Sequence, residues 1–62
     1  MTGKQFSSAI APWGFHTQAD LADWLGVSRR TAQNYIYDGP PEPVAKLIRL
    51  MVRLNLGPDD VP

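Results

Sequence analysis

One stretch, Thr17–Tyr37, constrains the fold more than any other, because it predicts two short helices joined by a tight turn. Thr17 is a good N-cap, and Asp20 places an acid in the first helical turn. Gly26 is expected to end this first helix, since glycine adopts the left-handed conformation without steric cost. Ser28 then caps a second helix, which is expected to end near Tyr37, before a turn-forming Asp-Gly-Pro sequence.

The second helix of this stretch has two different faces when its residues are placed at about 100° per position. The inward arc is mostly apolar and holds Thr31, Ala32, Tyr35 and Ile36. The outward arc is polar and holds Arg29, Arg30, Gln33, Asn34 and Tyr37. It carries no acid, whereas ordinary surface helices mix Glu and Lys in pairs of opposite sign.

The polar residue types on this outward arc are those that read DNA bases. Arginine can donate to O6 and N7 of guanine with both arms of its fork, and asparagine or glutamine can pair with N6 and N7 of adenine. Two helices, a glycine turn and a second cap form the sequence outline of a helix-turn-helix, whose second helix enters the major groove. The sequence therefore predicts duplex DNA as a partner.

A resemblance to a known family extends this interpretation. The pattern consists of Gln18, Leu21-Ala22, Leu25-Gly26-Val27-Ser28, Ala32, Tyr35 and Tyr37-Asp38-Gly39. Over residues 17–55 it resembles the phage-repressor and Cro-like class of helix-turn-helix proteins, also called the xenobiotic-response-element class. The resemblance implies that the start and outward face of the second helix read bases through Ser28, Arg29, Arg30, Gln33 and Asn34. It also implies a phosphate contact for Gln18, and we expect Thr17 and Tyr37 to join it at the DNA backbone.

The flanking segments predict two further helices. Thr2 and Gln5 have the spacing of a capping box for a helix over residues 3–11, which Pro12 should end. Pro43 is expected to open a last helix that runs to Asn55, with Gly57 just beyond its end. Three bulky aromatic residues are expected to pack in the core of so small a domain: Trp13, Phe15 and Trp24.

These elements predict an all-α, compact four-helix domain that contains the helix-turn-helix and has no β-wing. The excisionase and MerR-like group shares the turn, but those proteins usually follow it with a β-wing, where residues 40–55 here read as a helix. The repressor family often has five helices, so its usual dimer contacts do not transfer directly. We assign residues 1–56 to a DNA-binding domain with a C-terminal dimerisation helix, and residues 57–62 to a flexible tail.

The last helix is unusually apolar, which predicts self-association. A 62-residue chain without cysteine buries only about 60% of its unfolded surface and has no disulfide to stabilise it. The apolar side chains of this helix fill an arc of about 200°, more than one small core can cover. The expected dimer contacts are Leu47, Leu50, Met51 and Leu54, and the alternative flank is formed by Val52 and Leu56.

Composition restricts the remaining function classes. The formal net charge is +0, yet residues 28–56 hold five of the six basic side chains against only Asp38 and Glu42. A single histidine and no cysteine predict no metal site or cofactor, and no nucleophile stands near a base, so we expect no enzyme. No apolar run approaches the roughly 20 residues of a membrane span and no signal peptide is visible, so we expect a cytoplasmic protein without membrane or small-molecule partners.

The function that these patterns favour is transcriptional regulation by sequence-specific binding to duplex DNA. We expect a small phage or mobile-element repressor that binds an inverted-repeat operator as a homodimer. The alternative is a protein-interaction or antitoxin-like adaptor module that uses the apolar C-terminal helix, with the arginine face merely solvated.

Overall fold

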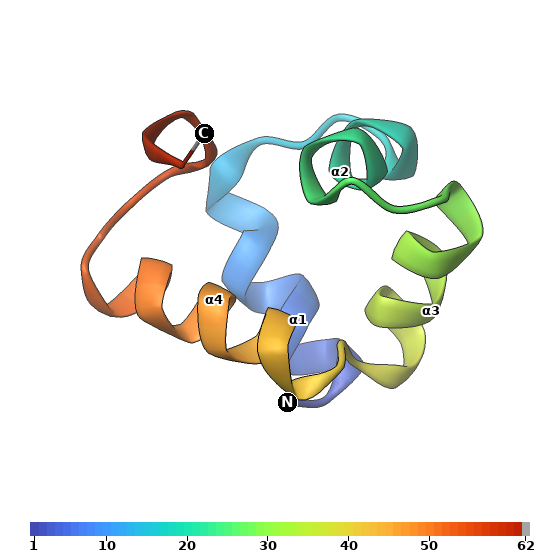
Figure 1. Ribbon diagram of the computed structural model, residues 1–62, viewed down its shortest axis with the longest axis horizontal. Coiled ribbons are helices and arrows are strands. Elements are labelled where there is room, and N and C mark those ends of the chain that lie inside the picture. The colour runs from blue at the N-terminus through green and yellow to red at the C-terminus, as the bar shows by residue number, and fades with distance from the viewer. Residues whose placement is uncertain (62) are drawn as a thin grey trace.

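The computed structural model describes residues 1–61, which contain four α-helices and two 3-10 turns joined by short connections (Figure 1). The α-helices are α1 (Gly3–Ile10), α2 (Gln18–Leu25), α3 (Arg29–Asp38) and α4 (Glu42–Arg53). The 3-10 turns are η1 (Ala11–Trp13) and η2 (Pro58–Asp60). No strand occurs in this part of the chain, so the prediction of an all-α four-helix domain is confirmed.

Side-chain caps open the first three helices where the sequence predicts them. The Thr2 hydroxyl accepts from the Gln5 amide at 3.1 Å, and Gln5 Oε1 accepts from the Thr2 amide at 2.8 Å, which completes a capping box on α1. Thr17 Oγ1 accepts from the Asp20 amide at 3.2 Å, and Ser28 Oγ accepts from the amide three residues on at 3.1 Å. Each cap satisfies a backbone donor that the helix leaves unpaired.

The end of α1 differs from the prediction. The α-helix ends at Ile10 rather than Ala11, and the chain continues as η1 through Trp13. Pro12 has no N–H to donate and restricts the residue before it, which tightens the last turn rather than stopping the chain in a loop. Gly14, with φ of 74°, then turns the chain away.

Both ends of α4 also differ. The helix begins at Glu42, so Pro43 lies at its second position, and it ends at Arg53 rather than Asn55. The left-handed residue beyond it is Asn55, with φ of 56°, and not Gly57, whose φ is −105°. Asparagine tolerates this conformation better than other non-glycine residues. It lets the Leu56 amide close the helix end by donating to Met51 O at 2.8 Å.

Helix α1 lies at the centre of the fold and packs against both α3 and α4, while α2 packs against α3 (Figure 1). The resulting core is entirely apolar. Its main cluster is formed by Phe6, Ile10, Leu21, Ala22, Ala32 and Ile48. Ala45 and Met51 of α4 are also buried, so α4 contributes its inward face to the same small domain.

The N-terminal turn of α1 approaches α3 so closely that only glycine fits. A Cβ on Gly3 would overlap the backbone of Ile36 and Tyr37. A Cβ on Gly39, just after α3, would overlap the carbonyl oxygen of Met1, and Gly39 has a φ of 99° as well. The start of the chain and the end of α3 are therefore locked together backbone to backbone.

The three predicted core aromatics form one partly buried cluster under the C-terminal segment. The Trp24 ring centroid lies 5.9 Å from that of Trp13 and 5.6 Å from that of Phe15. The Trp24 indole Nε1–H donates to Pro58 O at 3.2 Å, so the Trp24 side chain connects α2 to η2. The sequence predicts a flexible tail over residues 57–62, and this hydrogen bond to Pro58 is not part of that prediction.

Candidate nucleic-acid interface

Helix α3 presents the face that the sequence predicts. The inward residues are buried or half-buried: Thr31, Ala32, Tyr35 and Ile36. The outward residues are exposed: Arg29, Arg30, Gln33, Asn34 and Tyr37. The division of the two arcs is confirmed, and Tyr37 is the most exposed of the large apolar or aromatic side chains, at 70%.

The inward face holds α3 in a fixed orientation. Ala32 is completely buried, and the Tyr35 ring meets the Phe6 ring of α1 edge to face, with centroids 6.1 Å apart. The close contact between Gly3 and the backbone of Ile36 and Tyr37 holds the C-terminal turn of α3, and the Ser28 cap holds its N-terminus. A rigidly mounted helix loses little conformational entropy when its outer face binds a ligand.

The outward face of α3 is basic over most of its length. Its first acid is Asp38, at the last position of the helix. In the described part of the chain, the one salt bridge joins Arg49 to Glu42 on α4, so neither Arg29 nor Arg30 takes part in an ion pair there. Both guanidinium groups therefore remain available to a carboxylate, a phosphate or a base edge.

Ser28 stands at the start of this face, but its hydroxyl is already in use. It accepts from the Thr31 amide at 3.1 Å and donates to Thr31 Oγ1 at 2.9 Å. A base contact from Ser28 has to use a remaining lone pair of this oxygen or break the internal bond. Ser28 therefore serves first as the cap of α3.

Thr17 and Gln18 lie together where α2 begins. Thr17 is exposed and caps the helix, while Gln18 is half-buried. Gln18 borders a shallow hollow of about 230 Å³ between α1, α2 and α3. The hollow is lined by Ile10, Phe15, His16, Thr17, Gln18, Leu21 and Ile36.

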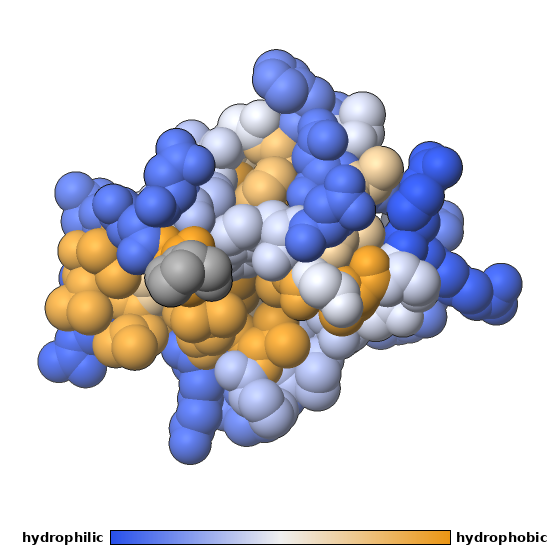
Figure 2. All heavy atoms as spheres, turned by 45° about the horizontal axis from the view of Figure 1, so that its top comes forward, coloured by the Kyte–Doolittle hydropathy of each residue, from blue (hydrophilic) through white to orange (hydrophobic). Residues whose placement is uncertain are grey.

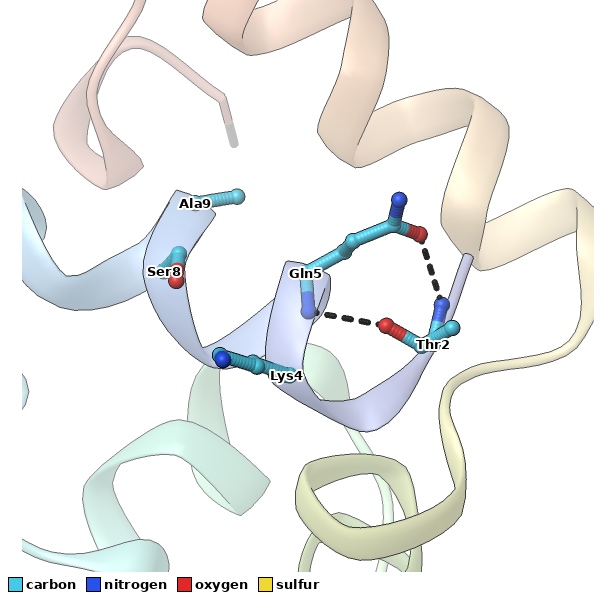
Figure 3. Close-up of a pocket in the computed structure, with 5 residues that line it drawn as sticks. All are labelled: Thr2, Lys4, Gln5, Ser8 and Ala9. Atoms are coloured by element: carbon cyan, nitrogen blue, oxygen red, sulfur yellow. Dashed lines mark hydrogen bonds between the residues drawn. The ribbon is translucent and has the colours of Figure 1, made fainter.

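A second, wider depression of about 630 Å³ runs along the outer side of α1 (Figure 3). It is lined by Thr2, Lys4, Gln5, Ser8 and Ala9. Figure 3 shows Thr2 and Gln5 bonded to each other in the capping box, so these two polar groups are already partnered. The depression offers no convergent set of free polar groups of the kind that fixes a small molecule.

One of the four predicted dimer contacts, Met51, does not lie at the surface. Met51 is only 1% exposed, so it belongs to the core and not to the outer surface of α4. It is therefore removed from the candidate contact. Leu50 and Leu54 are exposed at 53% and 56%, and Leu47 between them is half-buried.

The sequence analysis did not predict the hydrogen bond between Trp24 and Pro58, and it left open which side of α4 is exposed. The docking of Pro58 on Trp24 has no local sequence signal beyond a Pro that follows Gly57, because it joins residues 34 positions apart. Val52 is 53% exposed and Leu56 is half-buried, so the alternative flank of α4 is only partly free.

Within residues 1–61, no three His, Cys, Asp or Glu side chains come together as metal ligands, and no helix has the length and apolar character needed to cross a bilayer. No protein-family model, curated protein or solved structure matches this chain.

Proposed function

We propose that this protein binds duplex DNA in a sequence-specific way, with α3 in the major groove. One observation carries the proposal: the exposed face of α3 combines two arginines, which form no ion pair within residues 1–61, with two amide side chains, and it holds no acid before Asp38. Arg29 and Arg30 can each pair with guanine, and Gln33 or Asn34 with adenine.

The neighbouring helix supplies backbone contacts in this proposal. The α2 N-terminus carries the positive end of the helix dipole, and Thr17 and Gln18 stand beside it. Tyr37 extends from the other end of the reading face, where its hydroxyl can donate to a phosphate oxygen. These contacts set the position of α3 on the duplex, and the side chains of α3 supply the sequence information.

The role we assign to this binding is regulatory. A single reading helix on a small rigid domain can occupy an operator and block polymerase, which is the action of a small repressor. A phage or mobile-element origin, which the sequence resemblance suggests, and a cytoplasmic location are further parts of this proposal.

Selection from a pool of random duplexes tests the proposal. The purified protein should enrich one short motif, and gel-shift titration should show that the motif binds at least about 10³-fold more tightly than a scrambled duplex. A pool that stays random after repeated rounds, with intact helical circular dichroism, contradicts sequence-specific reading.

A second candidate is a protein-interaction or antitoxin-like adaptor module. The observation that favours it is the exposure of Leu50, Val52 and Leu54 on α4, which is unusual for a chain with so small a core. The two candidates differ in their response to salt, because displacement of phosphate counterions makes DNA binding fall steeply as salt rises, whereas apolar docking does not.

A further inference from the structure

Two rows of polar side chains run along the outward face of α3. At about 100° per residue, Arg29 and Gln33 lie within about 40° of each other, and Arg30 and Asn34 form a parallel row of the same kind. Each row begins with an arginine and continues with an amide side chain four residues later. All four side chains are exposed, and Figure 2 shows hydrophilic side chains projecting from the end of the molecule at which α3 lies in Figure 1.

The polar groups of the two rows are free to bind a ligand. Within residues 1–61, no hydrogen bond or ion pair engages the guanidinium or amide groups of these four side chains. The helix that carries them is continuous from Arg29 to Asp38 and is held at both ends. Helix geometry therefore sets the order in which the four residues meet a ligand that lies along α3.

The spacing of the two rows matches the base-pair spacing of B-DNA. A helix rises about 1.5 Å per residue, so the two arginines are offset by about 1.5 Å and each amide follows its arginine by about 6 Å. Base pairs are stacked about 3.4 Å apart, so about 6 Å corresponds to roughly two base pairs. A helix that lies along the major groove thus places both amides two base pairs beyond the arginines.

We propose that α3 reads a block of four base pairs, in which two adjacent G·C pairs are followed directly by two adjacent A·T pairs. The inference deepens, and rests on, the proposed DNA-binding function. An arginine fork occupies O6 and N7 of one guanine, and a G·C pair has only one guanine, so two arginines at neighbouring positions need two adjacent G·C pairs. An amide occupies N6 and N7 of one adenine, so the two amides need two adjacent A·T pairs by the same argument.

The ends of the outward face limit the block to these four pairs. Tyr37 lies about 12 Å beyond Arg29, which is roughly three and a half base pairs, and base contacts come from the N-terminal part of a reading helix. Its single hydroxyl cannot make the paired contact that an arginine or an amide makes with one base. At the other end, the hydroxyl of Ser28 is already bonded within the helix cap.

The motif that is enriched from a pool of random duplexes tests the block. We expect two adjacent positions that require G·C, followed by two that require A·T. Arg29→Ala and Arg30→Ala should each relax one G·C position and weaken binding about 5- to 150-fold. Gln33→Ala and Asn34→Ala should each relax one A·T position. Arg53→Ala, an exposed arginine on α4, is the control and should leave all four positions unchanged.

A modified base gives a readout that a merely structural role of these side chains would not move. 7-Deazaguanine lacks the N7 acceptor but pairs with cytosine as guanine does, so it removes one of the two bonds that an arginine fork makes. At each guanine of the block it should weaken binding of the unmodified chain about fivefold or more. Arg29→Ala should lose no further affinity at the guanine whose position it relaxes.

The outcomes separate this inference from the function on which it rests. A motif without the block, or arginine variants that relax A·T positions, overturns the block while sequence-specific binding stands. Binding that is insensitive to 7-deazaguanine at both G·C pairs overturns it as well. A pool that enriches no motif, with intact helical circular dichroism, contradicts the proposed function itself.

Discussion

At the scale of single residues, Gly3 and Gly26 are required for different physical reasons. Gly26 has a φ of 74°, but a Cβ there meets nothing within 4 Å. A side chain at Gly26 would therefore be opposed by backbone strain and not by crowding. Gly3 has the opposite problem, because its Cβ would enter the backbone of α3.

The first prediction ranks these two sites by the stability that the domain loses when glycine is replaced by alanine. Gly3→Ala should destabilise the domain by about 3 kcal/mol or more, because neither backbone can move without separating α1 from α3. Gly26→Ala should cost about 1–2 kcal/mol, the penalty for a left-handed alanine. Gly14→Ala is the control, since it has the same φ of 74° and the same open space. Urea denaturation measures all three, and a Gly26→Ala variant less stable than Gly3→Ala would falsify this packing.

The second prediction concerns a single hydroxyl. Tyr37→Phe keeps the ring and removes only the group that we expect to contact phosphate. Affinity should fall by a similar factor for the selected motif and for scrambled DNA, because a phosphate contact carries no base information. Gln18→Ala should behave alike. Titration against a panel of motif variants is the check, and a changed order of preference among them contradicts the phosphate role.

At the scale of elements, the C-terminal segment links α4 to α2. The Asn55 turn redirects the chain, and Pro58 O accepts the indole N–H of Trp24 at 3.2 Å. The third prediction is that deletion of residues 57–62 shifts tryptophan emission to longer wavelength, because it exposes the indole to water. It should also lower the free energy of unfolding by about 1 kcal/mol, the usual contribution of one hydrogen bond.

A matched variant isolates the residue responsible. In Trp24→Phe, Trp13 is the remaining tryptophan, and the same deletion should shift its emission much less. If the full-length and shortened chains give identical spectra and identical melting curves, the segment does not dock in solution as it does here.

The elements also show which features follow from local sequence. Caps at Thr2, Thr17 and Ser28 and the turn at Gly26 depend on a few neighbouring residues, and all were predictable. The two faces of α3 follow from helical periodicity alone. The end of α4 did not follow from local sequence. Asn55 and Gly57 can both adopt the left-handed conformation, and which of them does so depends on the direction that the chain takes after the helix.

Other features depend on contacts between distant residues. Met51 and Leu50 are neighbours in a continuous apolar arc, and only the packing of α4 in the folded domain decides that Met51 is buried and Leu50 exposed. The contact between Trp24 and Pro58, like the need for glycine at position 3, arises from packing that no local pattern records.

At the scale of the whole molecule, the fourth prediction separates the two candidate functions. The formal net charge is zero, so affinity for DNA has to come from local charge on and around α3. The logarithm of the DNA association constant should fall linearly with the logarithm of salt concentration. Docking of a partner protein on the exposed apolar side chains of α4, which are Leu50, Val52 and Leu54, should instead hold or strengthen in a sulfate salt. A DNA affinity independent of salt contradicts a phosphate-bound complex.

The central claim is that the outward face of α3 reads base edges, and Arg30→Ala tests it most directly. The variant should bind the selected motif about 5- to 150-fold more weakly, which corresponds to about 1–3 kcal/mol, and relax the preference at one base pair. Its melting curve should be unchanged, since Arg30 is exposed and takes part in no ion pair in the described chain. Arg53→Ala, an exposed arginine on α4, is the control and should leave the preference intact. If Arg30→Ala binds the motif as tightly and as selectively as the parent protein, α3 does not read DNA in the way proposed.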